Sequence, residues 1–499
     1  MSIAIIASRA QLGIESPPVT IEVFLSGGLP RFNVVGMPET AVRESSDRVR
    51  AAIINSGLPF PRERITVSLA PADMRKTGGR FDLAIALGIL CAQRVIPARS
   101  LDNVEFLGEL SLTGDLRPVP GVLPAAARAD AAGNAVMVPR DNAAEAALAR
   151  CTVYPAKTLL DVVAHLKGTA CIEAEPEVRP GPTVFAGADL DEVRGQSRAK
   201  RALEIAAAGG HNLLLIGPPG TGKSMLARRL PGILPPMTDQ EALETAGVDS
   251  VLGNSIDLPR WRLRPFRAPH HTASAPAVVG GGPGPRPGEI SRAHNGVLFL
   301  DELPEFSRHV LEVLREPLEA GSITISRAAQ QADFPARVQL VAAMNPCPCG
   351  YLGDTRGSCH CSRDRVAAYR SKISGPLLDR IDLRIEVGRP AVDALRDNGA
   401  RGESSSTVRE RVVAARYLAL ARSGLCNAQL EGQQIEAACR TCDDGLALLD
   451  EAIERFALSV RAYHRVLRVS RTIADLANAD TVGAAHVAEA LSLRALEQR

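Results

Sequence analysis

The stretch GPPGTGKS has the residue types and the spacing that bind the phosphates of a nucleotide. It follows the apolar run Leu213–Ile216 and precedes the helix-like Met225–Arg228. A glycine-rich loop between a strand and a helix lets backbone N–H groups reach phosphate oxygens, and the helix N-terminus adds a positive end. The sequence therefore predicts a P-loop in which Lys223 reaches the β- and γ-phosphates and Ser224 binds Mg²⁺. The candidate nucleotide-binding residues are Gly217, Pro218, Pro219, Gly220, Thr221, Gly222, Lys223 and Ser224.

Two carboxylates follow a second apolar run. Asp301 and Glu302 come directly after Val297–Leu300. Behind a P-loop, an apolar strand that ends in Asp-Glu indicates nucleotide hydrolysis. Asp301 would hold the Mg²⁺ shell, and Glu302 would orient or deprotonate the attacking water. The predicted cofactors are therefore ATP and Mg²⁺.

Three further polar residues have positions from which they could act on the γ-phosphate. Asn345 follows a third apolar run, Val338–Met344, and could position the lytic water. Arg380 is a candidate arginine finger for a neighbouring subunit, a role worth about 10³–10⁵ in rate. The alternative is a surface arginine that pairs with an adjacent aspartate. Arg461 stands near the start of a predicted helix, where it either contacts ATP or lies on a solvated face.

Four cysteines form the pattern C-x-C-x₉-C-x-C directly after Asn345. A structural zinc site needs four sulfur atoms about 2.3 Å from one ion. We favour zinc over four reduced thiols, and both over disulfides, because thiols stay reduced in the cytoplasm. Since the P-loop lies elsewhere in the sequence, loss of the metal is expected to leave ATP affinity largely intact. The candidate ligands are Cys347, Cys349, Cys359 and Cys361.

Composition limits the class of protein. A chain of 499 residues predicts roughly three domains. With 58 basic and 56 acidic residues, the net charge of +2 does not indicate a globally basic nucleic-acid binder, so any such contact needs a local patch or a ring of subunits. The longest apolar stretch, Leu83–Ala92, is far short of the roughly 18–20 residues of a membrane span. Without a secretory signal pattern either, the expected location is cytoplasmic.

The elements that must position these residues can be read from periodicity. Alternating apolar residues predict strands at Ile21–Leu25 and Ile65–Leu69, whereas 40–55 and 81–91 read as helices. Beyond residue 403, apolar residues recur at helical spacing. The predicted divisions are an α/β domain at 1–170, a Pro-rich linker at 171–186, an ATPase core at 187–390 that contains the cysteine loop 345–361, and a helical domain at 391–499.

Together these motifs resemble the magnesium-chelatase-like ComM/YifB family of AAA+ ATPases. The resemblance is carried by RPFRAPHHTASAPAVVGGG, PRPGEISRAHNGVLFLDELPEF, NPCPCGYLGD, SGPLLDRID and LSVRAYHRVLRVSRTIADL, in the family's order. It implies an α/β fold: an AAA+ P-loop NTPase core with a C-terminal helical lid, preceded by a Lon-protease-like α+β domain.

The resemblance also implies a function. Members look like ring-forming, hexameric DNA translocases or helicases that promote branch migration in natural transformation or recombination. The implied partners are single-stranded or branched DNA and recombination or competence proteins. The segments 270–282 and Ser322–Leu340 resemble pore-loop elements, with Arg327 and Gln330 near a hairpin tip. Arg260–His271 either contacts DNA or serves as a structural bracket.

Two competing functions can be weighed against this interpretation. In Lon-like peptidases a Ser–Lys dyad acts, but the corresponding places here fall at Arg80 and near Leu123, so we expect a non-proteolytic domain. The other alternative is a magnesium-chelatase-type ATPase motor that remodels a partner protein for metal insertion. The N-terminal domain and the cysteine loop argue against it, because the simple chelatase motor subunit has neither.

Overall fold

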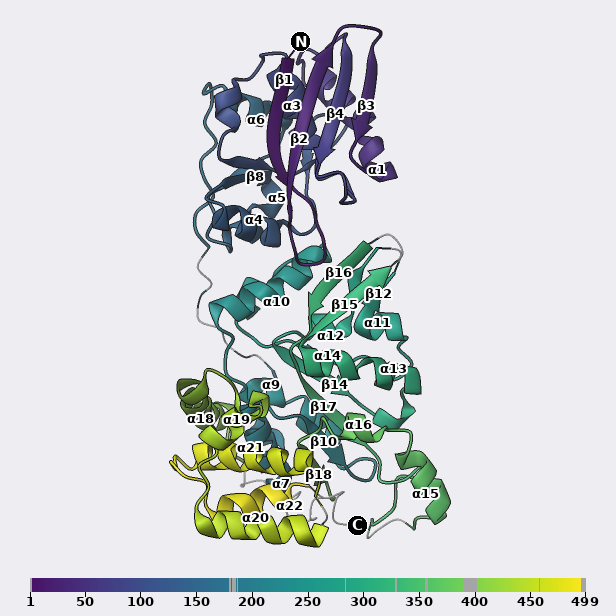
Figure 1. Cartoon of the computed structure of the whole chain (residues 1–499), viewed down its shortest axis with the longest axis vertical. Helices are drawn as coiled ribbons and strands as arrows, with labels where there is room; N and C mark the ends of the chain where they lie inside the picture. The colour runs from purple at the N-terminus through teal and green to yellow at the C-terminus, as the bar shows by residue number, and fades with distance from the viewer. Residues whose placement is uncertain are drawn as a thin grey trace.

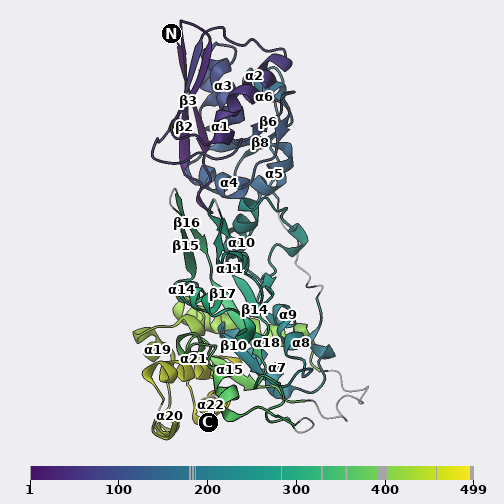
Figure 2. The same ribbon diagram turned by 90° about the vertical axis from the view of Figure 1, so that its right-hand side faces the viewer.

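The computed structural model describes residues 2–178, 187–282, 284–327, 330–354, 358–389, 402–456 and 458–494, together with residues 181 and 185. The N-terminal α/β part lies at one end of the long axis of the molecule (Figure 1). The central part contains a parallel sheet, and the C-terminal helices lie beside the half of it that is farther from the N-terminal part. The view turned by 90° shows the same arrangement (Figure 2).

Alternating apolar residues build the N-terminal sheet. In β2 (Pro18–Ser26), every second side chain from Val19 to Leu25 is buried, which is the periodicity of a strand with one covered face. β2 pairs antiparallel with β1 (Ser2–Arg9) and β4 (Arg64–Ala70), so both predicted strands are confirmed. The sheet has the order β3-β4-β2-β1-β5-β8-β9. Its other strands are β3 (Arg31–Val35), β5 (Val104–Phe106), β8 (Ala135–Pro139) and β9 (Val153–Ala156), and a separate ribbon pairs β6 (Glu109–Leu110) with β7 (Leu116–Arg117).

Helix α3 (Asp82–Ala92) is buried along its whole length, as its continuous apolar sequence predicts. The helix predicted over 40–55 is instead two helices, α1 (Thr40–Arg43) and α2 (Ser45–Asn55). The Ser45 hydroxyl at the junction donates to the Val42 carbonyl at 2.6 Å, and such local bonds compete with the helical ladder. The remaining helices here are a 3-10 turn at Ala98–Leu101, α4 (Val122–Ala131), α5 (Arg140–Ala147) and α6 (Leu159–Leu166).

The central sheet is parallel throughout, with the order β11-β14-β17-β10-β18. β10 (Leu213–Ile216) and β14 (Gly296–Leu300) are buried at every residue, as expected for strands covered on both faces. The other strands are β11 (Phe266–Arg267), β17 (Val338–Met344) and β18 (Leu383–Glu386). The helices are α7 (Ser197–Gly209), α8 (Lys223–Ala227), α9 (Leu230–Ile233), α10 (Asp239–Val251), α11 (Ala275–Val279), α12 (Glu289–Arg292), α13 (Arg308–Val313), α14 (Arg315–Ala320), α15 (Arg363–Arg370) and α16 (Gly375–Leu378), with 3-10 turns at Leu190–Glu192, Leu258–Arg260 and Leu303–Glu305.

Two antiparallel ribbons project from the central part toward the N-terminal part (Figure 1). The first pairs β12 (Gly280–Gly281) with β13 (Arg286–Pro287), and the second is the hairpin of β15 (Ser322–Arg327) and β16 (Gln330–Pro335). The ribbons touch, because a Cβ atom added to Gly280 would lie 2.4 Å from Cδ1 of Ile325. The backbones of Arg327 and Gln330 pair next to the hairpin turn, but their side chains lie outside the described part of the chain.

The regular elements described beyond residue 402 are helices, as predicted. They are α18 (Ser405–Ser423), a 3-10 turn at Asn427–Gln429, α19 (Gln433–Ala438), α20 (Asp443–Phe456), α21 (Val460–Leu476) and α22 (Ala484–Ser492). α18 and α21 pack against α7 of the central part. Among the described residues, no helix combines the length and the apolar character that crossing a bilayer requires.

Helix α10 joins the N-terminal part to the central part through a seam of hydrogen bonds and apolar contacts. The Gly121 N–H donates to the Ser250 carbonyl at 2.8 Å, and the Leu123 N–H donates to the Ser250 hydroxyl at 3.3 Å. Trp261 and Met237 belong to the same buried cluster as Leu123. The first part is therefore docked on α10, whereas six residues of the predicted linker 171–186 (179, 180, 182–184 and 186) lie outside the described residues.

Candidate nucleotide site and cysteine cluster

The P-loop connects β10 to α8, and its glycines have backbone requirements of their own. A Cβ atom at Gly217 would lie 2.2 Å from the Val387 carbonyl oxygen, so a side chain is excluded there. Gly220 and Gly222 have φ values of 76° and 86°, in the left-handed region that favours glycine. These glycines therefore leave the backbone N–H groups of the loop accessible to phosphate oxygens.

Lys223 lies inside this loop. Its Nζ atom donates to the carbonyls of Gly217 at 2.7 Å and Pro218 at 2.9 Å, and to Oδ1 of Asn345 at 3.1 Å. Burial lowers the pKa of the Lys223 ammonium, an effect that the charges of nearby carboxylates oppose. The amine is therefore held at the end of β10 by neutral acceptors, which a phosphate can replace.

The oxygen atoms expected around Mg²⁺ meet at the same edge of the sheet. The Ser224 hydroxyl donates to Oδ2 of Asp301 at 2.5 Å. Asp301 follows β14 and Asn345 follows β17, and parallel neighbouring strands bring their carboxyl ends together. A hydroxyl beside a carboxylate is the oxygen donor set that Mg²⁺ prefers next to nucleotide phosphates, so these residues fit the ion.

Glu302 differs from Asp301 in its backbone conformation and in the exposure of its side chain. Its φ is 53°, a left-handed conformation that is uncommon for a residue with a side chain. Its carboxylate is 55% exposed, so it remains accessible to water. The conformation turns the chain sharply after β14, and the Glu305 N–H donates to the Glu302 carbonyl at 2.7 Å.

His271 contacts Glu302, a partner that the sequence did not reveal. Its Nδ1 atom lies 3.3 Å from Oε2 of Glu302, and its ring packs edge-on against Phe306 at 6.5 Å between centroids. His271 follows β11, which is the sheet neighbour of β14. The motif APHHTAS could have drawn attention to His271. The sequence does not show that β11 pairs with β14, and this pairing is what brings His271 to Glu302.

Arg380 does not reach the P-loop of its own chain. Asn212, which precedes β10, donates its side-chain amide to the Arg380 carbonyl at 2.7 Å. The P-loop follows the other end of β10, and four residues at about 3.3 Å each separate the two edges by roughly 13 Å. The Arg380 side chain pairs with Glu319 rather than with an adjacent aspartate.

Arg461 lies on the same side of the molecule as Arg380. Its side chain is exposed, and its carbonyl accepts a hydrogen bond from Nε of Arg465 at 3.1 Å. Arg465 in turn pairs with Asp379 at 3.1 Å. The structure therefore brings Lys223, Ser224, Asp301, Glu302 and Asn345 together, and it leaves the two arginines at the opposite edge.

The four cysteines of the C-x-C pairs converge. The Sγ atoms lie 3.4 Å apart for Cys347 and Cys349, 3.7 Å for Cys347 and Cys359, and 3.6 Å for Cys349 and Cys359. With Cys361 included, all four sulfurs lie within 4.8 Å of one another. A tetrahedral Zn²⁺ with Zn–S bonds near 2.3 Å needs sulfurs about 3.8 Å apart, so the donor set fits the ion.

The cysteine loop packs directly on the nucleotide site. A Cβ atom at Gly350 would lie 2.8 Å from Cδ of Pro219 and 3.8 Å from Cγ of Asn345. This contact argues against the expectation that loss of the metal leaves ATP affinity largely intact. Separation along the sequence does not keep Gly350 away from the P-loop.

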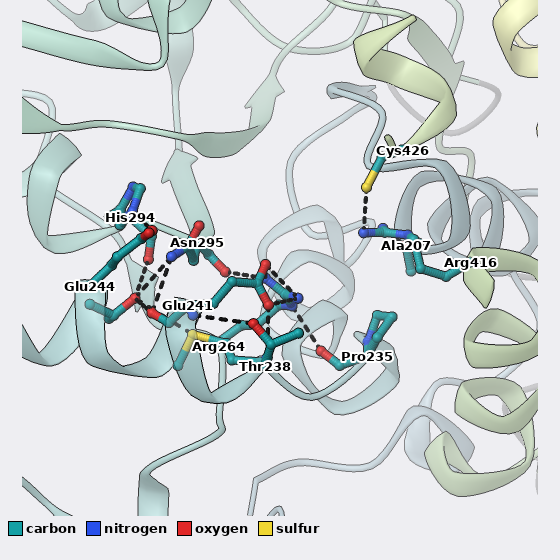
Figure 3. A network of polar contacts seen from close by, with 12 residues as sticks. Ala207, Pro235, Thr238, Glu241, Glu244, Arg264, His294, Asn295, Arg416 and Cys426 are labelled. Carbon is teal, nitrogen blue, oxygen red and sulfur yellow. Dashed lines mark hydrogen bonds and ion pairs between the residues drawn. The ribbon is translucent and has the colours of Figure 1, made fainter. Parts of the chain in front are cut away.

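The basic segment Arg260–His271 is largely engaged within the protein. Arg264 pairs with Glu241 at 3.0 Å and donates to the carbonyls of Pro235 at 2.8 Å and Asn295 at 2.7 Å (Figure 3). These contacts favour the structural bracket over DNA contact. The same holds for the pairs Arg262–Asp239 and Arg267–Glu289, both at 2.6 Å.

Comparison with known proteins places this geometry in a family context. Three family models match the chain in order: "Subunit ChlI of Mg-chelatase" over residues 21–142, "Magnesium chelatase, subunit ChlI" over residues 189–395, and "Magnesium chelatase, subunit ChlI C-terminal" over residues 402–494. The competence protein ComM of Haemophilus influenzae is 52% identical over 99% of this chain and 98% of its own length. YifB of Salmonella typhimurium is 48% identical over 100% and 98%. A magnesium-chelatase 38 kDa subunit of Cereibacter sphaeroides is 25% identical over 39% of this chain and 57% of its own length.

Proposed function

This chain belongs to the magnesium-chelatase-like ComM/YifB family, and on that premise we propose that it is an ATP-driven motor that assembles into a homo-hexameric ring and translocates on DNA. The link to DNA rests on its full-length similarity to a protein named for competence. Within that role, the specific activity is branch migration in natural transformation or recombination, on single-stranded or branched DNA and together with recombination or competence proteins.

The observation that carries the proposal is the division of the nucleotide machinery between two edges of one sheet. Lys223 and Asp301 lie where β10 and β14 end, whereas Arg380 lies where β10 begins. A single chain therefore offers a P-loop without a finger at one edge and a finger without a P-loop at the other. Subunits arranged head to tail in a closed ring would complete every site.

Each residue of the site has a role in this proposal. Lys223 binds the β- and γ-phosphates, and Ser224 and Asp301 hold Mg²⁺. Glu302 orients the attacking water or takes its proton. Asn345, which accepts a hydrogen bond from Lys223 in this structure, positions that water. Arg380 acts on the γ-phosphate of the neighbouring subunit, and the exposed Arg461 faces the same neighbour. Bound Mg²⁺ supplies charge stabilisation at the phosphates.

The cysteine cluster has a structural role in the proposal. Four thiolates close the coordination shell of a zinc ion, which leaves no open position for water, so the ion would take no part in hydrolysis. Its binding would order the loop that supports Pro219, since Gly350 lies against that residue.

The alternative motor, one that remodels a partner protein for metal insertion into a tetrapyrrole, is favoured by the chelatase descriptions of the family models. Against it, the aligned part of the chelatase subunit spans only 39% of this chain. A peptidase is disfavoured by Arg80, which is 3% exposed and donates to the carbonyl of Pro120. Burial lowers the pKa of Arg80 to about 10, yet it remains a cation at neutral pH and offers no nucleophile.

ATP turnover with and without nucleic acid tests the proposal. The rate should rise with single-stranded or forked DNA and stay unchanged with a tetrapyrrole and its chelatase partner. Electron microscopy of a Glu302→Gln variant with ATP and forked DNA should show six-membered rings on the fork. Turnover that responds to the tetrapyrrole system and ignores every DNA would replace this proposal with the chelatase alternative.

A further inference from the structure

Both terminal nitrogens of the Arg380 guanidinium are engaged within its own chain. Nη1 donates to the Pro376 carbonyl at 2.7 Å, and Nη2 contacts the carboxylate of Glu319. The Arg380 side chain is only 19% exposed, and its Nε atom is buried without a hydrogen-bond partner among the described residues. The finger is thus held in place, although not all its donors are satisfied.

Glu319 belongs to the element that leads into the β15–β16 hairpin. It is the penultimate residue of α14, which is followed by Gly321 in the left-handed conformation, with φ 68°. β15 begins at the next residue, Ser322. Any displacement of the base of the hairpin would therefore move the carboxylate that holds Arg380.

The two residues face an open pocket of about 400 Å³, which is lined by three glutamates, two arginines and an alanine. The two contacts use only two of the five N–H groups of Arg380, but they fix where the guanidinium lies. Arg380 must leave Glu319 before the guanidinium can turn outward and bind an oxyanion through a pair of parallel hydrogen bonds. Glu319 is the acceptor that can leave readily, since its carboxylate is 70% exposed and exposed ion pairs are weak. The pocket is lined by Glu312, Arg315, Glu316, Glu319, Ala320 and Arg380.

We propose that Glu319 is a positioning residue that holds Arg380 away from the neighbouring subunit's γ-phosphate until the hairpin moves. The inference rests on the proposed role of Arg380 as a finger in trans. It connects the hairpin of one subunit to hydrolysis in the next through a single ion pair, and it predicts that the hairpin's contact with DNA releases the finger. Glu319 is then a brake on hydrolysis in the absence of DNA.

Glu319→Gln in the full-length chain tests this. The amide keeps the size of the side chain and removes its charge, so turnover without DNA should rise about two- to fivefold, the range expected for an exposed ion pair. Stimulation by single-stranded DNA should shrink by a similar factor, while KM for ATP stays close to the parental value. The matched control is Glu316→Gln, which removes a charge from the same helix and pocket but touches no contact of Arg380.

The double variant Glu319→Gln/Arg380→Ala separates this inference from the proposal beneath it. If Glu319 acts through Arg380, adding Glu319→Gln to Arg380→Ala changes nothing further. Equal effects of Glu319→Gln and Glu316→Gln, or an effect that persists without Arg380, would overturn the role of Glu319 alone. Parental turnover by Arg380→Ala, with rings still formed, would instead overturn the finger.

Discussion

At the scale of single residues, Glu302 combines an unusual backbone conformation with a position in the candidate site. A side chain in the left-handed region costs conformational energy, and such residues gather at functional sites. Here the conformation places Glu302 beyond the end of β14, with Asp301 bonded to Ser224 and His271 beside Glu302. Adjacent carboxylates thereby have different surroundings: Asp301 accepts a hydrogen bond from Ser224, whereas Glu302 is exposed to water.

We expect Glu302→Gln to bind ATP and to hydrolyse it about 10²–10⁴ times more slowly, because a general base contributes an effect of that size. Gln keeps the shape of the side chain, so nucleotide affinity should stay near the parental value. Single-turnover hydrolysis and equilibrium nucleotide binding measure the two quantities separately. Glu305→Gln, a nearby exposed carboxylate that pairs with Lys372 at 3.6 Å, is the control. Parental turnover by Glu302→Gln would remove Glu302 from this role.

His271 should matter for turnover more than for binding. Its ring restricts the Glu302 carboxylate through the 3.3 Å contact, so His271→Ala should lower kcat about two- to fivefold and leave KM for ATP nearly unchanged. His271→Gln keeps an N–H donor and should retain more of the rate. His309→Ala, which removes an exposed imidazole from α13, serves as the control in steady-state assays. His270 is unsuitable, because its ring packs on that of His271 with 4.1 Å between centroids. An equal loss in both variants would mean that the effect is not specific to the contact with Glu302.

At the scale of elements, much of the central part could be predicted from the sequence. The strands β10, β14 and β17 are short apolar runs, and the residues that follow them were assigned to the nucleotide site on that basis. Local patterns carry this information because a strand buried on both faces must be apolar throughout.

The remaining contacts depend on which elements become neighbours, and local patterns do not encode that. The sequence did not show that β11 lies beside β14, which brings His271 to Glu302. Nor did it show that Gly350 lies on Pro219. The break between α1 and α2 was missed for a different reason, because the Ser45 hydroxyl bond to Val42 competes with an otherwise helical pattern.

The cysteine loop gives an element-scale prediction. Replacing Cys359 and Cys361 with serine should release about one zinc per chain, because two thiolates do not complete a tetrahedral shell. Elemental analysis of the parental protein, purified without added metal or chelator, gives the reference value. Because Gly350 rests on Pro219, the variant should also show a higher KM for ATP.

The control for this experiment is the pair Cys171→Ser and Cys442→Ser, which changes two exposed cysteines outside the cluster. It should retain the metal and the parental KM. Clearly substoichiometric zinc in the parental protein, with all four clustered thiols open to titration in the folded state, would return the cluster to four reduced cysteines.

At the scale of the whole molecule, the two-edged site predicts complementation between defective subunits. Arg380→Ala keeps the P-loop, and Lys223→Ala keeps the finger. In rings formed by random mixing of equal amounts, about a quarter of the interfaces combine an intact P-loop with an intact finger, so turnover should recover toward a quarter of the parental rate. Each variant alone should be nearly inactive in the same assay.

Mixing must be shown independently, for example by energy transfer between labelled subunits. Mixed rings without recovered turnover would mean that Arg380 does not serve its neighbour. Recovery would show that the P-loop and the finger of one active interface come from different subunits.

The seam between Ser250 and the Gly121–Leu123 turn limits how the domains of such a chain can recombine during evolution. A Pro-rich connector invites the view that the first 170 residues are a cassette, free to be exchanged between relatives. The seam opposes this, because losing that domain would expose the buried Trp261 to water and break the hydrogen bonds of Gly121 and Leu123 to Ser250. The two surfaces of the seam must therefore evolve together. A crossover in the connector yields a stably folded chimera only when the two parents have the same residues at the seam.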